Sequence, residues 1–144
     1  MKIEHILIVA DDSPPSVNAI QYGFNLARDL GARVTLLSVI ERITAGNPDA
    51  GIFPDDAAIA HQAKTDAFLN RMKDEHAKNV NTEVLISHGD ILTEIMDAAH
   101  KINPDLIIAG THSRTGLNKL LRGSIAESII HRSPVPVCIV PMAK

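Results

Sequence analysis

The residues best suited to hold a ligand lie in one glycine-bearing stretch, residues 105–124, with the sequence DLIIAGTHSRTGLNKLLRGS. An apolar run opens the stretch and a helical pattern follows it. Small residues leave backbone N–H groups accessible beside a helix start, where an anion such as a phosphate can bind. The glycine spacing matches neither GxxxxGK[ST] nor GxGxxG, so a surface loop that needs glycines for its turns explains it at least as well. The small residues of the stretch are Gly110, Thr111, Ser113, Thr115, Gly116, Gly123 and Ser124.

Charged residues supply two further candidates. Within the stretch, Arg114 could clamp a phosphate group, or it could be an ordinary solvated arginine. Near the amino terminus, Asp11 and Asp12 follow an apolar run and could hold Mg²⁺ or take part in acid–base chemistry. The alternative is turn chemistry, in which Asp11 bonds the backbone and Asp12 is solvated. We expect Asp11 to contact a ligand and Asp12 to be solvated.

The histidines and the cysteine suggest neither a metal site nor a nucleophile. The seven histidines are scattered without metal-ligand spacing, and only His112 lies within the glycine-bearing stretch, where we expect it to be exposed. Cys138 sits in an apolar run and is expected to be an inert core thiol. No catalytic set is recognisable, so the sequence predicts no dedicated enzyme.

Composition narrows the class of protein. The chain has 144 residues, of which 45% are apolar, so we expect one domain with a real hydrophobic core. A net charge of −3 and an aromatic content of 3% argue against nucleic acid as a partner. No apolar run is long enough to span a bilayer, and the amino-terminal segment is interpreted as a strand and not as a signal peptide. The expected location is the cytoplasm, which a single cysteine also fits.

Apolar runs and helical spacing predict nine alternating elements. The strands are expected over residues 6–10, 34–40, 82–87, 105–109 and 135–141, and the helices over 14–30, 56–79, 91–102 and 124–131. A loop over residues 41–56 is long enough to be a lid or a binding loop. The long second helix has only a thin apolar stripe, which we expect to lie on the sheet. Its members are Ile59, Ala63, Ala67, Phe68 and Met72.

Strands that alternate with helices predict a doubly wound α/β fold, with a five-stranded parallel sheet and helices on both faces. In such sheets, ligands bind beyond the carboxyl ends of the strands, where the strand order reverses. The segments after the first, second and fourth strands are therefore expected to converge. Prolines 134, 136 and 141 predict that the last strand lies at an edge, and its apolar character favours pairing with a second copy.

Three segments of the chain, in the right order, resemble the universal stress protein family. ILIVADDSPPS is similar to the family's ILVAxDGSxxS, and SHGDILTEIMDAAHKINPDLIIAGTHSRTGL to its xxGDPxxxIxxxAxxxxxDLIxxGxHGRxGL. LLRGSIAESIIHRSPVPVCIV matches LLxGSxAExxxxxxxxPVxxV. The resemblance implies a single domain over residues 1–144 with a Rossmann-like fold. It also implies a homodimer through the last strand, with higher assembly allowed, and an interface at Val135, Val137, Ile139 and Val140.

Family members that bind ATP carry G-x2-G-x9-G-[ST] after the fourth strand. The spacing is kept here from Gly110 to Gly123 and Ser124, but Ser113 takes the place of the second glycine. Asp12 likewise replaces the usual glycine after the first aspartate. By resemblance, Asp11 would meet the ribose or adenine and Val39 would contact the adenine. The full set of expected nucleotide contacts is Ala10, Asp11, Val39, Gly110, Thr111, Ser113, Arg114, Gly123, Ser124 and Ile125.

Two functions follow from this pattern. The first is a regulatory stress-response protein that binds ATP with Mg²⁺, with at most weak hydrolysis, and signals its nucleotide state to an unidentified protein partner. The second is a stress-linked interaction module of the same fold that binds no nucleotide, for which Ser113 and Asp12 are the evidence. The first is favoured because the other loop positions and their spacing match the family's motif.

Overall fold

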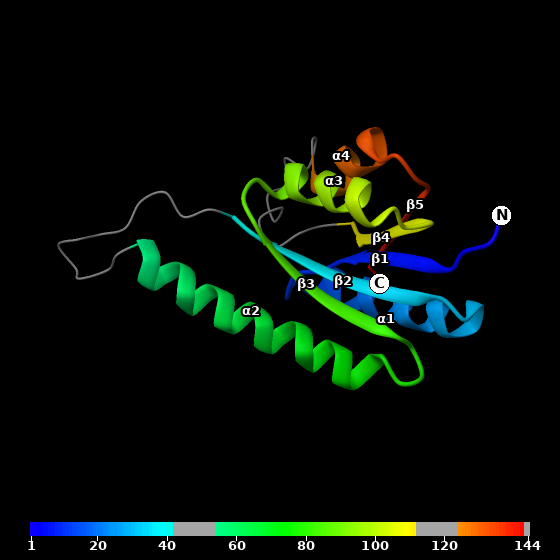
Figure 1. Ribbon diagram of the computed structural model, residues 1–144, viewed down its shortest axis with the longest axis horizontal. Coiled ribbons are helices and arrows are strands. Elements are labelled where there is room, and N and C mark those ends of the chain that lie inside the picture. Colours follow the sequence, from blue (N-terminus) through cyan, green and yellow to red (C-terminus); the bar gives the residue numbers. More distant parts are fainter. Residues whose placement is uncertain (42–53, 112–123, 143–144) are drawn as a thin grey trace.

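The computed structural model describes residues 1–41, 54–111 and 124–142, and these form one sheet covered by helices (Figure 1). The elements alternate along the chain as the sequence predicts. The strands are β1 (His5–Val9), β2 (Arg33–Ile40), β3 (Thr82–His88), β4 (Leu106–Gly110) and β5 (Val137–Val140). The helices are α1 (Pro14–Leu30), α2 (Pro54–His76), α3 (Ile91–Ile102) and α4 (Ile125–Arg132).

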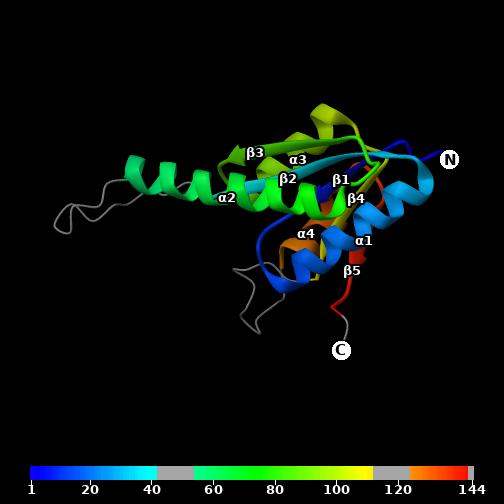
Figure 2. The ribbon, with the colours of Figure 1, turned by 90° about the horizontal axis from the view of Figure 1, so that it is seen from below.

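The five strands are all parallel and lie in the order β3-β2-β1-β4-β5, so the predicted doubly wound, Rossmann-like sheet is confirmed. Helices α1 and α2 cover one face, and α3 and α4 cover the other (Figures 1 and 2). Side-chain alternation along β1 explains this division, because successive residues of a strand point to opposite faces. Ile6 and Ile8 join the core under α1 and α2, and Leu7 joins the core under α3 and α4.

Local capping sets the ends of α1. At the amino end, the Ser13 hydroxyl accepts the Ser16 N–H at 3.4 Å, and Pro14 takes the first helical position, where a missing N–H costs nothing. At the carboxyl end, Gly31 has a φ of 68°, a left-handed conformation that favours glycine. Both predicted ends of this helix are therefore confirmed, and its apolar face, centred on the fully buried Phe24, packs on the sheet.

Helix α2 packs on the sheet through its carboxyl-terminal half only. Phe68, Leu69 and Met72 are buried, whereas Ile59 is 70% exposed. The predicted stripe was wrong at Ile59, Ala63 and Ala67, which are exposed, and it missed Leu69. Figures 1 and 2 show that the amino-terminal turns of α2 extend beyond the carboxyl ends of the strands, so no sheet lies under them. Ala67 directly precedes the buried Phe68, so it is exposed because it lies on the outer face of the helix.

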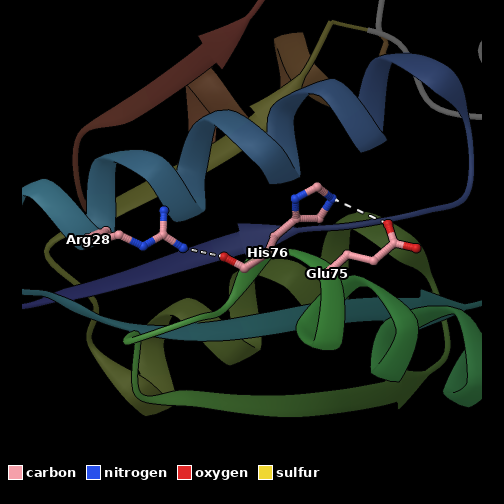
Figure 3. A network of polar contacts seen from close by, with 3 residues as sticks. All are labelled: Arg28, Glu75 and His76. Carbon is pink, nitrogen blue, oxygen red and sulfur yellow. Dashed lines mark hydrogen bonds and ion pairs between the residues drawn. The ribbon is translucent and has the colours of Figure 1, made fainter.

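The carboxyl end of α2 is fastened to α1 by one arginine (Figure 3). The Arg28 guanidinium donates to the backbone carbonyl of His76 through Nη2 and to that of Lys78 through Nε, the latter at 2.9 Å. Its Nη1 also donates to the Asn25 side chain at 3.0 Å, which holds the guanidinium plane. Because the last carbonyls of a helix lack partners within it, this arginine acts as a cap supplied by another helix.

Strand β5 lies at an edge of the sheet, as its prolines predict, but it is shorter than expected. The Ile107 N–H donates to the Pro136 carbonyl at 3.0 Å, just before the strand begins. Val137 and Ile139 are half-buried, whereas Val140 is buried in the core of its own chain. Cys138 is also half-buried and packs against the core, in agreement with a packing role. Among the described residues, no helix combines the length and the apolar character that crossing a membrane requires.

Candidate functional site

The strand order reverses between β1 and β4, and four of the predicted site residues lie at the carboxyl ends of these strands and of β2. Ile8 of β1 pairs with Ile108 of β4, and two residues farther along come Ala10 and Gly110. On the other side, Val9 pairs with Leu37 of β2, so Asp11 and Val39 also follow at the same distance. The Ala10 N–H donates to the Leu37 carbonyl at 2.7 Å and extends this ladder. The carboxyl ends of β1, β2 and β4 therefore lie side by side, at the edge where doubly wound sheets hold their ligands.

Gly110 is a glycine because the first turn of α1 lies against it. A Cβ at this position would stand 2.7 Å from the carbonyl oxygen of Pro15 and 3.3 Å from the backbone N of Ser16. Gly110 does not have a positive φ, so its backbone conformation does not call for glycine. Glycine is needed here because a Cβ would collide with the backbone of α1. The first glycine of the predicted motif thus brings β4 close to the start of α1.

Asp11 is held in the turn that leads from β1 into α1. Its backbone N–H donates to the Ser16 hydroxyl at 2.7 Å, and its carboxylate Oδ1 accepts the Ser13 N–H at 2.8 Å. Asp11 therefore bonds the backbone of the turn through one carboxylate oxygen, as the alternative interpretation of this residue expects. The same two bonds hold the carboxylate at the carboxyl ends of the strands. Asp12 is half-buried, against the expectation that it is solvated.

The amino end of α1 has few N–H groups to offer an anion. Pro14 and Pro15 occupy its first two positions and have no N–H. The next two donors are used within the turn: the Ser16 N–H by the Ser13 hydroxyl and the Val17 N–H by the Ser13 carbonyl at 3.0 Å. Any helix-start contact with a phosphate must therefore come from another helix at this edge.

Helices α3 and α4 both begin at this edge, and their caps differ in charge. The cap of α3 is the Asp90 carboxylate, which accepts the Thr93 N–H at 3.0 Å and the Thr93 hydroxyl at 2.8 Å. These bonds hold the pKa of Asp90 below its usual value, so this helix start already carries a negative charge. The cap of α4 is the neutral hydroxyl of Ser124, which accepts the Glu127 N–H at 3.2 Å. The start of α4 is therefore the better of the two for an anion.

The Ser124 hydroxyl retains a proton that it can donate. A serine hydroxyl is one donor and two acceptors, and the cap uses an acceptor position. The N–H groups of Ile125 and Ala126, in the first turn of α4, have no acceptor within the helix. Ile125 and Val39 both turn half-buried side chains toward the core under α3 and α4, so an apolar surface adjoins these polar groups.

The described residues include seven of the ten predicted contacts: Ala10, Asp11, Val39, Gly110, Thr111, Ser124 and Ile125. Ala10 is buried and Thr111 is half-buried after the end of β4. Ser113, Arg114 and Gly123 lie outside the described residues, as does His112. Within the described part of the chain, no three side chains of His, Cys, Asp or Glu form a group that could hold a metal ion.

Sequence reasoning missed the part that Pro15 and Ser16 play at the site. Their backbone lies against Gly110, and the Ser16 hydroxyl holds Asp11. The only sequence signal for this contact was the pair of prolines after Ser13, which marks the helix start but not its neighbour. Contacts between segments about a hundred residues apart need the sheet order, which the sequence pattern does not supply.

Comparisons with known proteins agree with this architecture. The model of the Universal stress protein family matches residues 2–141. The chain is 30% identical over 142 residues to Universal stress protein MJ0531 of Methanocaldococcus jannaschii, covering 96% of this chain and 82% of that protein.

Solved structures of the same family share the fold. Universal stress protein UspA from Lactobacillus plantarum superposes with a TM-score of 0.85 at 21% identity, covering 97% of this chain and 99% of that one. A universal stress protein in complex with cAMP has a TM-score of 0.73 at 19% identity, covering 99% and 100%. The universal stress protein from Archaeoglobus fulgidus in complex with dAMP has a TM-score of 0.63 at 18% identity, covering 96% and 98%. The chain described here belongs to the universal stress protein family.

Proposed function

We propose that this chain is a regulatory stress-response protein that binds an adenine nucleotide, ATP with Mg²⁺, between the segments that follow β1, β2 and β4. The observation that carries the proposal is the close approach of Gly110 to the first turn of α1, at a distance that no side chain allows. Proteins of this family with the same fold are described in complex with cAMP and with dAMP, which share an adenine base, a pentose and a phosphate.

The proposed contacts divide by chemistry. The phosphates lie at the start of α4, where the Ser124 hydroxyl and the N–H groups of Ile125 and Ala126 donate to them. Asp11 accepts a hydrogen bond from the ribose or the adenine, and Val39 contacts the adenine. Because α1 offers almost no donor and α3 begins with the Asp90 carboxylate, α4 alone supplies the helix-start contact. Ser113, Arg114 and Gly123 are proposed as further contacts on the strength of the motif.

The nucleotide acts as a state signal in this proposal, with at most weak hydrolysis. A ligand shifts a conformational equilibrium only by its difference in affinity for the two states, so ATP must contact a part of the chain that changes. We propose that the signal reaches a protein partner through a homodimer formed along β5, the edge strand, where Val135, Val137 and Ile139 are half-buried. Val140 contributes through its backbone, because its side chain is used by its own core.

The test measures bound nucleotide in the purified protein and titrates ATP by calorimetry with and without Mg²⁺. Ser124→Ala is expected to weaken binding about tenfold or more, since a hydrogen bond to a charged group contributes about 1.5–3 kcal/mol. It also removes a helix cap, which lowers stability by about 1 kcal/mol.

A matched control separates the two effects of this substitution. Asp90→Ala removes the cap of α3, with a comparable stability loss, at a helix start that we do not assign to the nucleotide. Its affinity for ATP is expected to equal that of the natural sequence. No heat and no melting shift at millimolar ATP would refute nucleotide binding and favour the interaction module that binds no nucleotide.

A further inference from the structure

His5 is the first residue of the central strand β1 and lies at the end of the sheet opposite the candidate site. It is buried, and one of its two ring nitrogens has no hydrogen-bond partner among the described residues. The residue is 7% exposed. The ring nitrogen Nε2 lies 2.7 Å from the Thr35 hydroxyl of β2, and the other nitrogen, Nδ1, is buried with no hydrogen-bond partner. Strand alternation puts His5 on the same face as Leu7, under α3 and α4.

Protonation would give this ring a second N–H donor for which the described part of the folded chain offers no acceptor. A neutral imidazole is a donor at one nitrogen and an acceptor at the other, so with Nε2–H donating to Thr35 the bare Nδ1 lone pair is tolerated. The imidazolium carries N–H at both nitrogens. Its Nδ1–H would then be a buried charged donor without an acceptor, which is among the most costly states of a polar group.

Charged groups surround the ring from three neighbouring segments. Arg33 pairs with His5 in the β1–β2 register, Glu83 of β3 pairs with Thr35, and Asp105 precedes β4. The last turn of α3, which covers this face, carries the exposed His100 and Lys101. Burial and then Arg33 lower the pKa of His5 below its ordinary value of 6.5, while Asp105 and Glu83 act in the opposite direction. The folded chain therefore favours the neutral ring.

The same residues hold this edge of the sheet together. The Asp105 carboxylate accepts the N–H groups of Glu4 at 2.9 Å and His5 at 3.0 Å, and the Asp105 N–H returns a bond to the His5 carbonyl at 2.8 Å. The Arg33 N–H donates to the Glu4 carbonyl at 3.0 Å. A charged ring is attracted toward the carboxylates of Asp105 and Glu83. If it leaves Thr35 for Asp105, it competes with the Glu4 and His5 N–H groups for that carboxylate and disturbs these bonds.

We propose that protonation of His5 opens the amino-terminal edge of the sheet and makes this edge a proton-sensitive switch. The closed state holds the neutral ring on Thr35, and the open state holds the charged ring near Glu83 and Asp105. Stability from the neutral ring is complete above pH 6.5 and falls as the pH drops from there toward the lowered folded-state value. The switch is separate from the nucleotide site, which lies at the other end of the strands.

Amide hydrogen exchange tests the opening directly. After correction for intrinsic rates, protection of the Arg33 and Asp105 amides is expected to fall between pH 7.5 and 5.5, by up to tenfold for each unit of pKa lowering. Protection of the Ala10 amide, which donates to the Leu37 carbonyl at the far edge, is expected to stay constant. An equal fall at both edges, or none at either, would overturn the proposal.

Variants test whether His5 is the group that titrates. In His5→Gln, a side-chain amide can still donate to Thr35 but cannot be protonated, so the pH dependence at Arg33 and Asp105 should vanish. In His131→Gln, which removes an exposed imidazole from α4, it should persist. A pH dependence that survives in His5→Gln contradicts the assignment.

Two exposed charges give an opposite-sign test on the folded protein. The His5 titration is followed by the NMR shift of its ring carbons. Glu83→Gln removes an attraction for the imidazolium and should lower the midpoint, whereas Arg33→Gln removes a repulsion and should raise it. A midpoint of 6.5 in the natural sequence, or shifts of the same sign in both variants, would refute the proposal even if His5→Gln fails to fold.

Discussion

A single methyl group at position 110 should damage both stability and ligand binding. The Cβ of Gly110→Ala would stand 2.7 Å from the Pro15 carbonyl oxygen, whereas ordinary contacts begin at 3.4 Å, so the shortfall is 0.7 Å. The opposing atoms are backbone, in a turn that Pro14 and Pro15 make stiff, and cannot rotate away as the tip of a side chain would. Either β4 or the start of α1 must move.

The magnitude follows from the cost of forcing extra atoms into a packed site. Such changes cost about 1–3 kcal/mol, which lowers the melting temperature of a domain of this size by about 3–10 °C. The displacement also reaches the candidate site, because the Ser16 hydroxyl, one residue after Pro15, accepts the Asp11 N–H at 2.7 Å. Calorimetric ATP titration should therefore show weaker binding in Gly110→Ala at temperatures where the protein remains folded.

Gly31→Ala is the matched control. Its Cβ would meet no atom within 4 Å, so its cost comes only from the left-handed φ of 68°, about 1 kcal/mol or somewhat more. It lies at the far end of α1 and should leave ATP affinity unchanged. If Gly110→Ala melts within a degree of the natural sequence, the close approach of α1 and β4 does not constrain the fold and the reasoning fails.

Four other predictions follow from the described contacts. Arg28→Lys should lower unfolding stability by about 1 kcal/mol in urea denaturation, because an ammonium group cannot replace the planar guanidinium that bonds two carbonyls; an unchanged midpoint would contradict the capping role. Leu69→Ala should cost about 2–5 kcal/mol and Ile59→Ala close to nothing, which the same denaturation series can check. The bonds from two backbone N–H groups lower the pKa of Asp105, so its contribution to the free energy of unfolding is present above pH 3.8 and is lost as the pH falls through the folded-state pKa. Asp105→Asn should therefore reduce the pH dependence of stability in this acidic range. An acid unfolding curve identical to that of the natural sequence would disprove it. Val137→Arg should yield monomers in sedimentation experiments while Ile59→Arg does not, and a dimer that persists in both would exclude the β5 interface.

The fold was predictable where its determinants are local. Helix α1 begins and ends at its predicted caps because Ser13 and Gly31 act through bonds within three or four residues of themselves. The edge position of β5 followed from its prolines, which cannot donate to a neighbouring strand. These rules need no knowledge of the rest of the chain.

The features that escaped prediction depend on what lies beside a segment in space. The apolar face of α2 was misplaced for two reasons. The pattern was extended over turns that have no sheet beneath them, and within the packed half it included the exposed Ala67 instead of the buried Leu69. His5 was not singled out, since the first strand was expected to begin at Ile6; extending the strand by one residue would have put His5 on the face of Leu7. The contact between Gly110 and Pro15 joins two segments whose proximity depends on strand order.

The attachment of α2 gives the molecule an uneven mechanical character. The carboxyl-terminal half of this 23-residue helix is held by the buried Leu69 and by the bond from Arg28 to the His76 carbonyl. The amino-terminal turns extend past the strands and have no sheet beneath them. A rotation of α2 about its packed half therefore moves the amino-terminal turns farther than any other part of the helix. A protein that binds near Ile59 and displaces these turns would therefore act on the Arg28–His76 contact and through it on α1. The first turn of α1 borders Asp11 and Gly110.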